Sequence, residues 1–418
     1  MEVRPGFKQT EIGVIPEDWE AAELGAHATF KTGPFGSALH RSDYVEGGIP
    51  VVNPMQIVDG RIRATPSMAI TEAAARKLSE FRLSTGNVVI GRRGDMGRCA
   101  VVGSEEEGWL CGTGSMIIRA RPSLDSEFLQ RILSSPPIIA EIENASVGTT
   151  MINMNQGTLG RLLIPFPPVK SEQEAVAKAL RDADMLIESV ERLLVKKRDL
   201  KRGAMQELLT GERRLPGFSG EWGVRSLRSC LLASPDYGIN APGVPVSGDL
   251  PTYLRITDID DDGRYISVNR VAVNHSLAMN YLLGKNEIVF ARTGASVGKT
   301  YLYDAKDGEL VFAGFLIRAR IDCQKLNPDF FAAYTRTSSY WGWVRVMSMR
   351  SGQPGINGNE FASLELCLPP TVEEQHAVAG ILSDMDADIL ALERKLAKAK
   401  LLKQGMMQEL LTGRIRLV

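Results

Sequence analysis

Two short loops combine glycine with basic residues in a pattern that suits contact with phosphate groups. In residues 92–98 and 292–299, an arginine is followed two residues later by a glycine, and a second glycine precedes a basic residue. Glycine lets backbone amides approach an anion closely, and the flanking charges add attraction. We therefore predict that both loops contact DNA, with a tight turn carrying solvated charges as the alternative. The basic residues concerned are Arg92, Arg93, Arg98, Arg292 and Lys299.

Three further motifs imitate known sites but lack residues that those sites need. Residues 294–300 end as a phosphate-binding P-loop does, yet Thr293 stands where its first glycine is required. The aspartates of residues 258–262 imitate a calcium loop, but Asn269 replaces the bidentate glutamate, so we expect a solvated acidic turn. The aromatic cluster at 340–343 could stack on bases, although core packing is the more ordinary use.

Catalytic and metal-binding constellations are missing from the sequence. The four histidines have neither triad nor ligand spacing, and Phe166-Pro167-Pro168 lacks the Asn or Asp of an adenine methyltransferase tetrad. The five cysteines contain no Cys-x-x-Cys pair, so we expect no metal site. The sequence therefore favours a binding protein over an enzyme, with no catalytic residue.

An internal repeat dominates the rest of the chain, which must hold the two loops. Residues 167–215 and 369–417 align without a gap at a shift of 202, and 27 of the 49 positions are identical. Apolar residues recur alternately three and four apart, a period typical of a coiled-coil seam. Each copy begins with two prolines, and Gly211 and Gly413 follow the apolar pattern. We predict two helices of about 39 residues, each roughly 58 Å long.

Neither predicted helix can bury its apolar seam alone, so we expect the two to pack on each other or on another chain. Lys197, Lys201 and Lys403 also fall on the seam, where their long stems could reach solvent or meet acidic partner residues. The apolar seam positions are Val176, Leu180, Ile187, Val190, Leu194, Leu208, Val378, Leu382, Ile389, Leu392, Leu396 and Leu410.

The repeat divides the chain into two globular segments, each followed by a helix. We predict domain 1 at residues 1–166, a central helix at 167–215, domain 2 at 216–366 and a C-terminal helix at 367–418. The same order of strand, glycine loop, strand, helix and polar loop recurs in both domains with little identity. The expected fold class is α/β (α+β) with a pseudo-twofold internal repeat, in which similar helices carry two different domains.

Composition is that of an ordinary globular protein, with 44% hydrophobic and 24% charged residues and a net charge of −1. Proteins that bind DNA by bulk electrostatics usually carry a basic excess, so positive charge must gather on one face or come from partners. No run of 18 apolar residues and no apolar leader occurs, which predicts neither a membrane span nor export. Five scattered cysteines suit a reducing cytoplasm.

The chain resembles the specificity (S) subunits of type I restriction-modification systems over essentially its whole length. The resemblance rests on KQTEIGVIPEDWEAAELG at 8–25, GSALHRSDYVEGGIPV at 36–51, the two glycine loops and, above all, the doubled helices ending in MQELLTG. In such subunits, two target recognition domains each read half of a bipartite DNA site. Their conserved helices form an antiparallel coiled coil that separates the domains.

The resemblance implies double-stranded DNA, two modification (methyltransferase) subunits and restriction (translocase and nuclease) subunits as partners, without a membrane. S-adenosylmethionine, ATP and Mg²⁺ would be cofactors of those partners. Because the two domains differ, an asymmetric site is expected. A coiled-coil scaffold with protein-binding domains and an S-like subunit of a modification-only defence system are the alternatives. Weaker candidates for DNA contact are Asn53, Gln56, Arg255, Thr149, Thr150 and Gln353.

Overall fold

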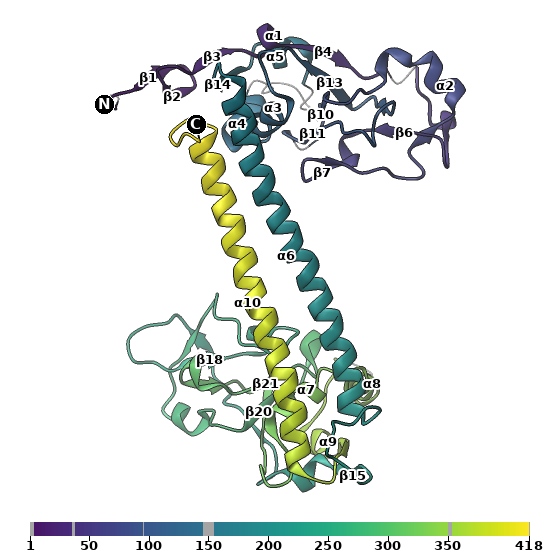
Figure 1. Cartoon of the computed structure of the whole chain (residues 1–418). Coiled ribbons are helices and arrows are strands. Elements are labelled where there is room, and N and C mark those ends of the chain that lie inside the picture. Colours follow the sequence, from purple (N-terminus) through teal and green to yellow (C-terminus); the bar gives the residue numbers. More distant parts are fainter. Residues whose placement is uncertain (1–3, 36–37, 95, 145–153, 350–352, 418) are drawn as a thin grey trace. The chain divides into compact units, whose positions relative to one another are not determined.

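The computed structural model describes residues 4–35, 38–94, 96–144, 154–349 and 353–417. The chain forms two compact units, the first from residues 1–190 and 395–418 and the second from residues 191–394. Each unit combines one globular domain with a stretch of each long helix (Figure 1). The long helices are α6 (Lys170–Thr210, 41 residues) and α10 (Val372–Leu410, 39 residues).

Two four-stranded sheets form the framework of domain 1. The first is antiparallel with the order β11-β10-β13-β4, and the second has the order β12-β6-β9-β5, in which β12 and β6 are parallel. The remaining strands pair as β1-β2, β7-β8 and β3-β14. The strands are β1 (Phe7–Thr10), β2 (Gly13–Pro16), β3 (Glu20–Glu23), β4 (Ala28–Thr32), β5 (Tyr44–Val45), β6 (Ile49–Val52), β7 (Ile57–Val58), β8 (Arg61–Ile62), β9 (Ala69–Ile70), β10 (Val88–Gly91), β11 (Cys99–Val101), β12 (Leu110–Cys111), β13 (Ser115–Ala120) and β14 (Leu163–Phe166).

Two of the five short helices of domain 1, α3 and α5, contact the first sheet and begin at polar caps, whereas α2 packs with residues of the second sheet. The Asp125 carboxylate accepts a hydrogen bond from the Phe128 amide (2.9 Å) at the start of α3, and Asn155 caps α5 in the same way. The helices are α1 (Leu24–His27), α2 (Glu72–Lys77), α3 (Ser126–Leu133), α4 (Pro136–Asn144) and α5 (Gln156–Gly160).

Domain 2 repeats this topology. Its first sheet has the order β21-β20-β23-β16, and its second has the order β22-β18-β19-β17, again with a parallel pair at β22-β18. The strands are β15 (Gly223–Ser226), β16 (Asp236–Tyr237), β17 (Gly243–Val244), β18 (Thr252–Leu254), β19 (Ala272–Val273), β20 (Glu287–Ala291), β21 (Thr300–Leu302), β22 (Leu310–Phe312), β23 (Leu316–Arg320) and β24 (Glu365–Leu368). The helices are α7 (Pro328–Tyr334), α8 (Ser338–Met347) and α9 (Gly358–Ala362). The mixed fold class and the repeat within the domains agree with the sequence-based expectation.

The two long helices run antiparallel where they meet inside each unit. In the first unit, Val176 and Leu180 of α6 share a core cluster with Leu410 of α10, and the same arrangement recurs in the second unit. Most predicted seam positions are buried, and Ile187, Leu392 and Leu396 are half-buried. Both helices end at a glycine in the left-handed region, with φ of 78° at Gly211 and 67° at Gly413, as predicted.

The seam lysines meet aspartates of the opposing helix. In the first unit, Lys403 Nζ lies 2.6 Å from Asp184. In the second unit, Lys197 and Lys201 pair with Asp388 (2.7 Å) and Asp386 (2.6 Å). This confirms the expectation that these lysines meet acidic residues. Since each pair joins fixed positions of the two helices, the pairs also favour one register.

Buried glutamines join each domain to the start of its long helix. The Gln173 carboxamide oxygen accepts from Asp125 N (2.7 Å), and its nitrogen donates to the carbonyls of Ser123 (2.9 Å) and Pro167 (2.8 Å). In domain 2, Gln375 accepts from Asn327 N (2.7 Å) and donates to Lys325 O (3.3 Å). Each glutamine satisfies loop backbone groups that burial removes from water.

An arginine beyond the end of the opposing helix reinforces each joint. Arg416 binds the buried carboxylate of Glu172 through two nitrogens and also reaches Asp18 at 3.0 Å. Arg214 binds the buried Glu374 with nitrogen to oxygen distances of 2.7 and 2.6 Å. Two parallel hydrogen bonds between ionised groups fix geometry as well as charge. Each joint therefore ties both long helices to one domain.

We predict that Gln173→Leu lowers the free energy of unfolding by about 3 kcal/mol, because three buried backbone groups lose their partners. Urea unfolding of the full chain measures the change. Gln408→Leu, at an exposed position of α10 in the same unit, is the matched control and should change little. Equal effects of the two substitutions would contradict the role assigned to Gln173.

Candidate nucleic-acid interface

The glycine loop of domain 1 is held by backbone hydrogen bonds on three sides. It connects β10 to β11, and Gly91 N donates to Arg98 O (2.8 Å) across its base. Arg92 N donates to Gly114 O (3.0 Å) in the turn before β13. Met154 N donates to Arg92 O (3.0 Å), which brings the residue two positions before α5 against the glycine loop. Arg92 therefore lies where three segments that are distant in sequence meet.

The glycine loop of domain 2 has the same three attachments. Ala291 N donates to Lys299 O (2.8 Å), Arg292 N to Phe315 O (3.0 Å), and Ile356 N to Arg292 O (2.9 Å). Residues 353–356, within the polar loop predicted at 350–359, are thus brought against the predicted glycine loop. The sequence pattern identified both loops in each domain, but it did not show that they touch.

The second glycine of each loop is required by conformation and by packing. Gly97 and Gly298 have φ of 81° and 88°, which L side chains rarely adopt. A Cβ at Gly298 would lie 2.6 Å from Val344 of α8, and one at Gly97 would collide with Ile139 of α4. Each loop therefore rests directly on a helix of its own domain.

The three arginines of the first loop differ in exposure. Arg93 and Arg98 are exposed, whereas Arg92 is half-buried and its Nε donates to Met154 O (3.3 Å). Burial and the neighbouring Arg93 charge lower the pKa of Arg92 from its usual value. A guanidinium still stays protonated at neutral pH, so the loop presents positive charge next to backbone amides.

The two basic residues of the second loop have different partners. Lys299 pairs with the exposed Asp261 at 2.7 Å, so its charge is partly neutralised. The Arg292 guanidinium lies over the ring of Tyr237, 4.9 Å from the ring centroid. Within the described residues no carboxylate pairs with Arg292. Of the two, Arg292 is the better placed to bind an incoming acceptor.

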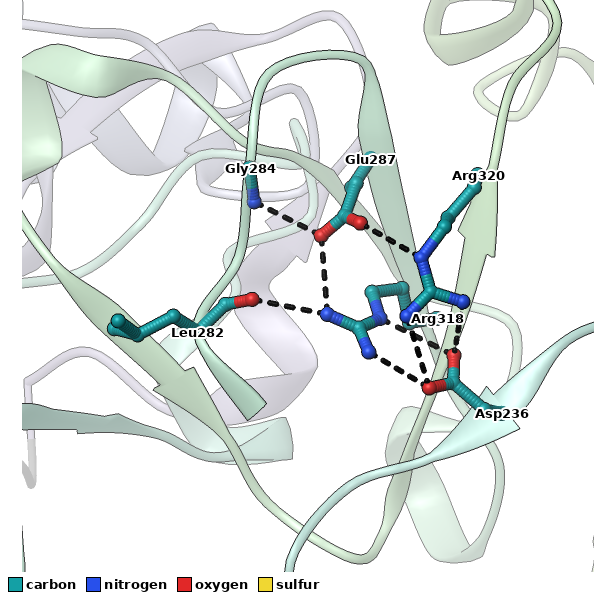
Figure 2. A network of polar contacts seen from close by, with 6 residues as sticks. All are labelled: Asp236, Leu282, Gly284, Glu287, Arg318 and Arg320. Carbon is teal, nitrogen blue, oxygen red and sulfur yellow. Dashed lines mark hydrogen bonds and ion pairs between the residues drawn. The ribbon is translucent and has the colours of Figure 1, made fainter. Parts of the chain in front are cut away.

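A buried charge network fixes the strand that carries Tyr237 (Figure 2). Arg318, 4% exposed, binds Asp236 at 3.1 and 2.7 Å and also donates to Leu282 O (2.9 Å). Glu287 accepts from Arg318 (3.3 Å) and Arg320 (3.1 Å). These contacts join β16, β20 and β23, so the network sets the position of Tyr237, the residue after Asp236.

Comparison with known sequences identifies the family. The profile of the type I restriction modification DNA specificity domain matches residues 16–196 and 252–401. The chain belongs to this family. A Methanocaldococcus jannaschii protein described as the MjaX type I restriction enzyme specificity subunit is 24% identical over 98% of this chain and 96% of its own length. The EcoKI specificity subunit of Escherichia coli K12 is 22% identical over 97% of this chain and 90% of its own.

Solved structures give the same fold. The S subunit of the type I restriction-modification system from M. genitalium superposes with a TM-score of 0.62 at 16% identity, over 98% of each chain. A chain from a study of assembly and conformational transition in the type I R-M system gives 0.55 at 18% identity, over 96% of this chain and 99% of its own. Each of the two segments that match the family profile contains one of the glycine loops and part of a long helix.

Three of the weaker candidates for DNA contact, which are Asn53, Gln56 and Arg255, form hydrogen bonds within their own domain. Gln56 is 6% exposed, accepts from Asn53 N (3.2 Å) and donates to Thr65 Oγ1 (3.1 Å). Arg255 binds Asp258 at 2.9 and 2.7 Å, in the equivalent turn of domain 2. These pairs cap short 3-10 turns, so the structure favours a structural role for them. The sequence predicted a solvated acidic turn at 258–262. This prediction was wrong for Asp258, which is buried and only 7% exposed.

The remaining weaker candidates lie in the polar loops. Gln353 is exposed, and a Cβ at Gly294 would lie 3.2 Å from its Nε2, so Gln353 reaches over the glycine loop. Thr149 and Thr150 lie outside the described residues.

The aromatic cluster on α8 packs into the core, with Tyr340 fully buried.

Sequence reasoning missed exposed apolar residues beside the loops. Phe315 is 58% exposed and Met55 is 81% exposed, the former opposite Arg292 and the latter next to the Asn53 turn. Phe315 stands in an apolar stretch that reads as a core strand, so the sequence gave no signal of its exposure, whereas Met55 lies between Pro54 and Gln56, where exposure could have been expected. Within the described ranges, no group of His, Cys, Asp or Glu side chains could hold a metal ion, and no helix is long and apolar enough to cross a membrane.

The Asp236 network predicts a dependence of stability on pH. Burial alone would raise the pKa of Asp236, but hydrogen bonding to Arg318 and the charges of Arg318 and Arg320 lower it below its ordinary 3.8. Its stabilisation is therefore complete above that ordinary pKa and is lost as pH falls through the lower folded value. Asp236→Asn should destabilise the chain at pH 7 by about 2 kcal/mol, less than for a fully buried pair because Asp236 is partly exposed.

Urea unfolding of wild type and Asp236→Asn at pH 7 and pH 3 measures this difference. The difference should shrink at pH 3, which lies below the ordinary pKa of an aspartate, because protonation of Asp236 then stabilises the unfolded wild-type chain more than the folded one. A difference of equal size at both pH values would contradict the charge interaction. Asp249→Asn, an exposed aspartate of the same domain, is the control.

Proposed function

We propose that this chain is the DNA-reading subunit of a type I restriction-modification assembly, with each domain reading one half of an asymmetric bipartite site. The supporting observation is that both domains hold their glycine loop by the same three backbone contacts but place different side chains around it. Gly114 lies opposite Arg92, whereas Phe315 lies opposite Arg292. A common frame with different surfaces is what two readers of different sequences require.

Positive charge at the loops would supply the phosphate contacts. The chain as a whole has a net charge of −1, so bulk attraction to DNA is weak. Arg93 and Arg98 are exposed, and among the described residues no carboxylate pairs with Arg292. Methyltransferase subunits that clasp the DNA would add the remaining contacts.

The exposed faces of the long helices are suited to docking two modification subunits. In the second unit, Leu193, Val195 and Leu200 of α6 are 42%, 59% and 51% exposed. Leu193 and Leu200, seven residues apart, share one face of the helix, and exposed apolar residues on one face favour a protein partner. Restriction subunits would join that assembly. Methyl transfer from S-adenosylmethionine and ATP- and Mg²⁺-dependent translocation and cleavage would then belong to the partners, with no catalytic role for this chain.

We predict that Arg92→Ala with Arg93→Ala weakens recognition of the first half-site about tenfold or more, because arginine contacts to phosphate and guanine are lost. The second half-site should be read as before. Sequencing of methylated sites from a random DNA pool, treated with the reconstituted complex, measures both halves.

Arg119→Ala with Arg121→Ala removes the same charge from exposed positions at the far end of β13 and is the control. Unchanged affinity and site preference after the loop substitutions would refute the loop assignment. A wild-type complex that enriches no bipartite sequence would instead favour a protein-binding scaffold.

We also predict that the long helices set the gap between the half-sites. Seven residues inserted after Val190 in α6 and after Arg394 in α10 add roughly 10 Å of helix while preserving the apolar period. The non-specific gap in the methylated site should then lengthen by about three base pairs, at 3.4 Å each. An insertion in α6 alone should disrupt assembly, because the opposing seam no longer matches. A gap of unchanged length after the double insertion would mean that the helices do not set it.

A further inference from the structure

Three side chains of domain 2 gather at one end of three neighbouring strands of its first sheet, β16, β23 and β20. The register pairs Ala291 with Leu316, and the hydrogen bond from Arg292 N to Phe315 O extends this pairing by one residue. Residues directly opposite each other in antiparallel strands present their side chains on the same face, with Cβ atoms about 5 Å apart. Arg292 and Phe315 are therefore neighbours on one face.

Tyr237 belongs to the same face. It pairs with Ile317, two residues along β23 from Phe315, and residues two apart on a strand share a face. Its ring, 42% exposed, lies beneath the Arg292 guanidinium. The Tyr237 hydroxyl also accepts a hydrogen bond from Gly358 N (3.1 Å) at the start of α9. The ring is thus fixed from both sides, by α9 and by the Asp236 network.

The stacking leaves the hydrogen-bonding edge of Arg292 available. A guanidinium stacked on a ring keeps its donors in a fixed plane, and among the described residues no carboxylate occupies them. By contrast, Arg255, Arg318 and Arg320 are all bound to carboxylates within the domain. A fixed arginine fork matches the O6 and N7 acceptors of guanine in the major groove.

Phe315 supplies a different kind of contact. It is 58% exposed in the short connection between β22 and β23, where packing gives no reason for a large apolar side chain. In domain 1 the equivalent position is Gly114, and a Cβ there would lie 2.9 Å from the Pro54 ring, so no side chain fits. In the major groove the apolar group that a protein can contact is the methyl of thymine.

We propose that Arg292, held over Tyr237, reads a guanine in the half-site of domain 2 and that Phe315 contacts the methyl group of a thymine in the adjacent base pair. This rests on the proposed function and deepens it by naming the bases that these residues read. The distance between the two side chains is compatible with contacts to adjacent base pairs. Cβ atoms of directly opposite residues are about 5 Å apart, and stacked base pairs are about 3.4 Å apart.

The experiment pairs protein variants with altered DNA. First, the complex with its modification subunits methylates a random DNA pool, and sequencing gives the half-site of domain 2. Phe315→Ala should reduce the preference for thymine at one position about fivefold, and Arg292→Lys should reduce that for the neighbouring guanine about tenfold. Tyr237→Phe should retain the guanine preference because the ring remains, and Tyr237→Leu should weaken it. Val268→Ala, an exposed apolar residue elsewhere in domain 2, should change neither.

Second, deoxyuridine replaces that thymine, which removes only the methyl group. Wild-type binding should weaken about fivefold, and binding by Phe315→Ala should weaken no further. Equal losses in both proteins, or a domain 2 half-site without adjacent G·C and T·A pairs, would overturn the proposal. The proposed function fails separately, when the wild-type complex enriches no bipartite site.

Discussion

The apolar seam of the long helices is the constraint on which the other contacts depend, because a single helix of about 40 residues cannot bury such a seam. In each unit, one domain and a stretch of the opposing helix cover it together. Lysines placed on the seam meet aspartates across it, as Lys201 meets Asp386, so the helices have a preferred register. The buried Gln173 and Gln375 then connect each domain rigidly to its helix.

Because the buried glutamines fix each domain on its helix, the surface residues of the two domains are free to differ from each other. The backbone contacts around Arg92 and Arg292 are the same, since they depend on strand order and on glycine conformation. The side chains next to them differ, because nothing in the frame specifies them. Arg318 is buried and bound to carboxylates of its own domain, whereas Arg292 has no carboxylate partner among the described residues. Burial and ion pairing therefore distinguish structural arginines from candidate DNA-binding arginines, which the sequence alone does not do.

The sequence predicted features that are local in the chain. Helical period, terminal glycines and glycine-rich turns follow from neighbouring residues, so α6, α10 and both loops were placed correctly. Features that depend on distant segments were not predicted. Asn53 looks like a polar loop residue, yet its side chain accepts a hydrogen bond from Gly114 N, which is 61 residues away in the chain. Phe315 stands in a strand-like apolar run, and only the pairing of β20 with β23 places it next to Arg292.

The central claim is that each domain reads its half-site independently on a common frame. The most direct measurement is the methylation specificity of a chain in which residues 222–368 are replaced by residues 19–166, so that domain 1 occurs twice. The two segments begin at equivalent tryptophans and end before equivalent helices. The account predicts a methylated site containing the half-site of domain 1 twice. Retention of the original asymmetric site would contradict it.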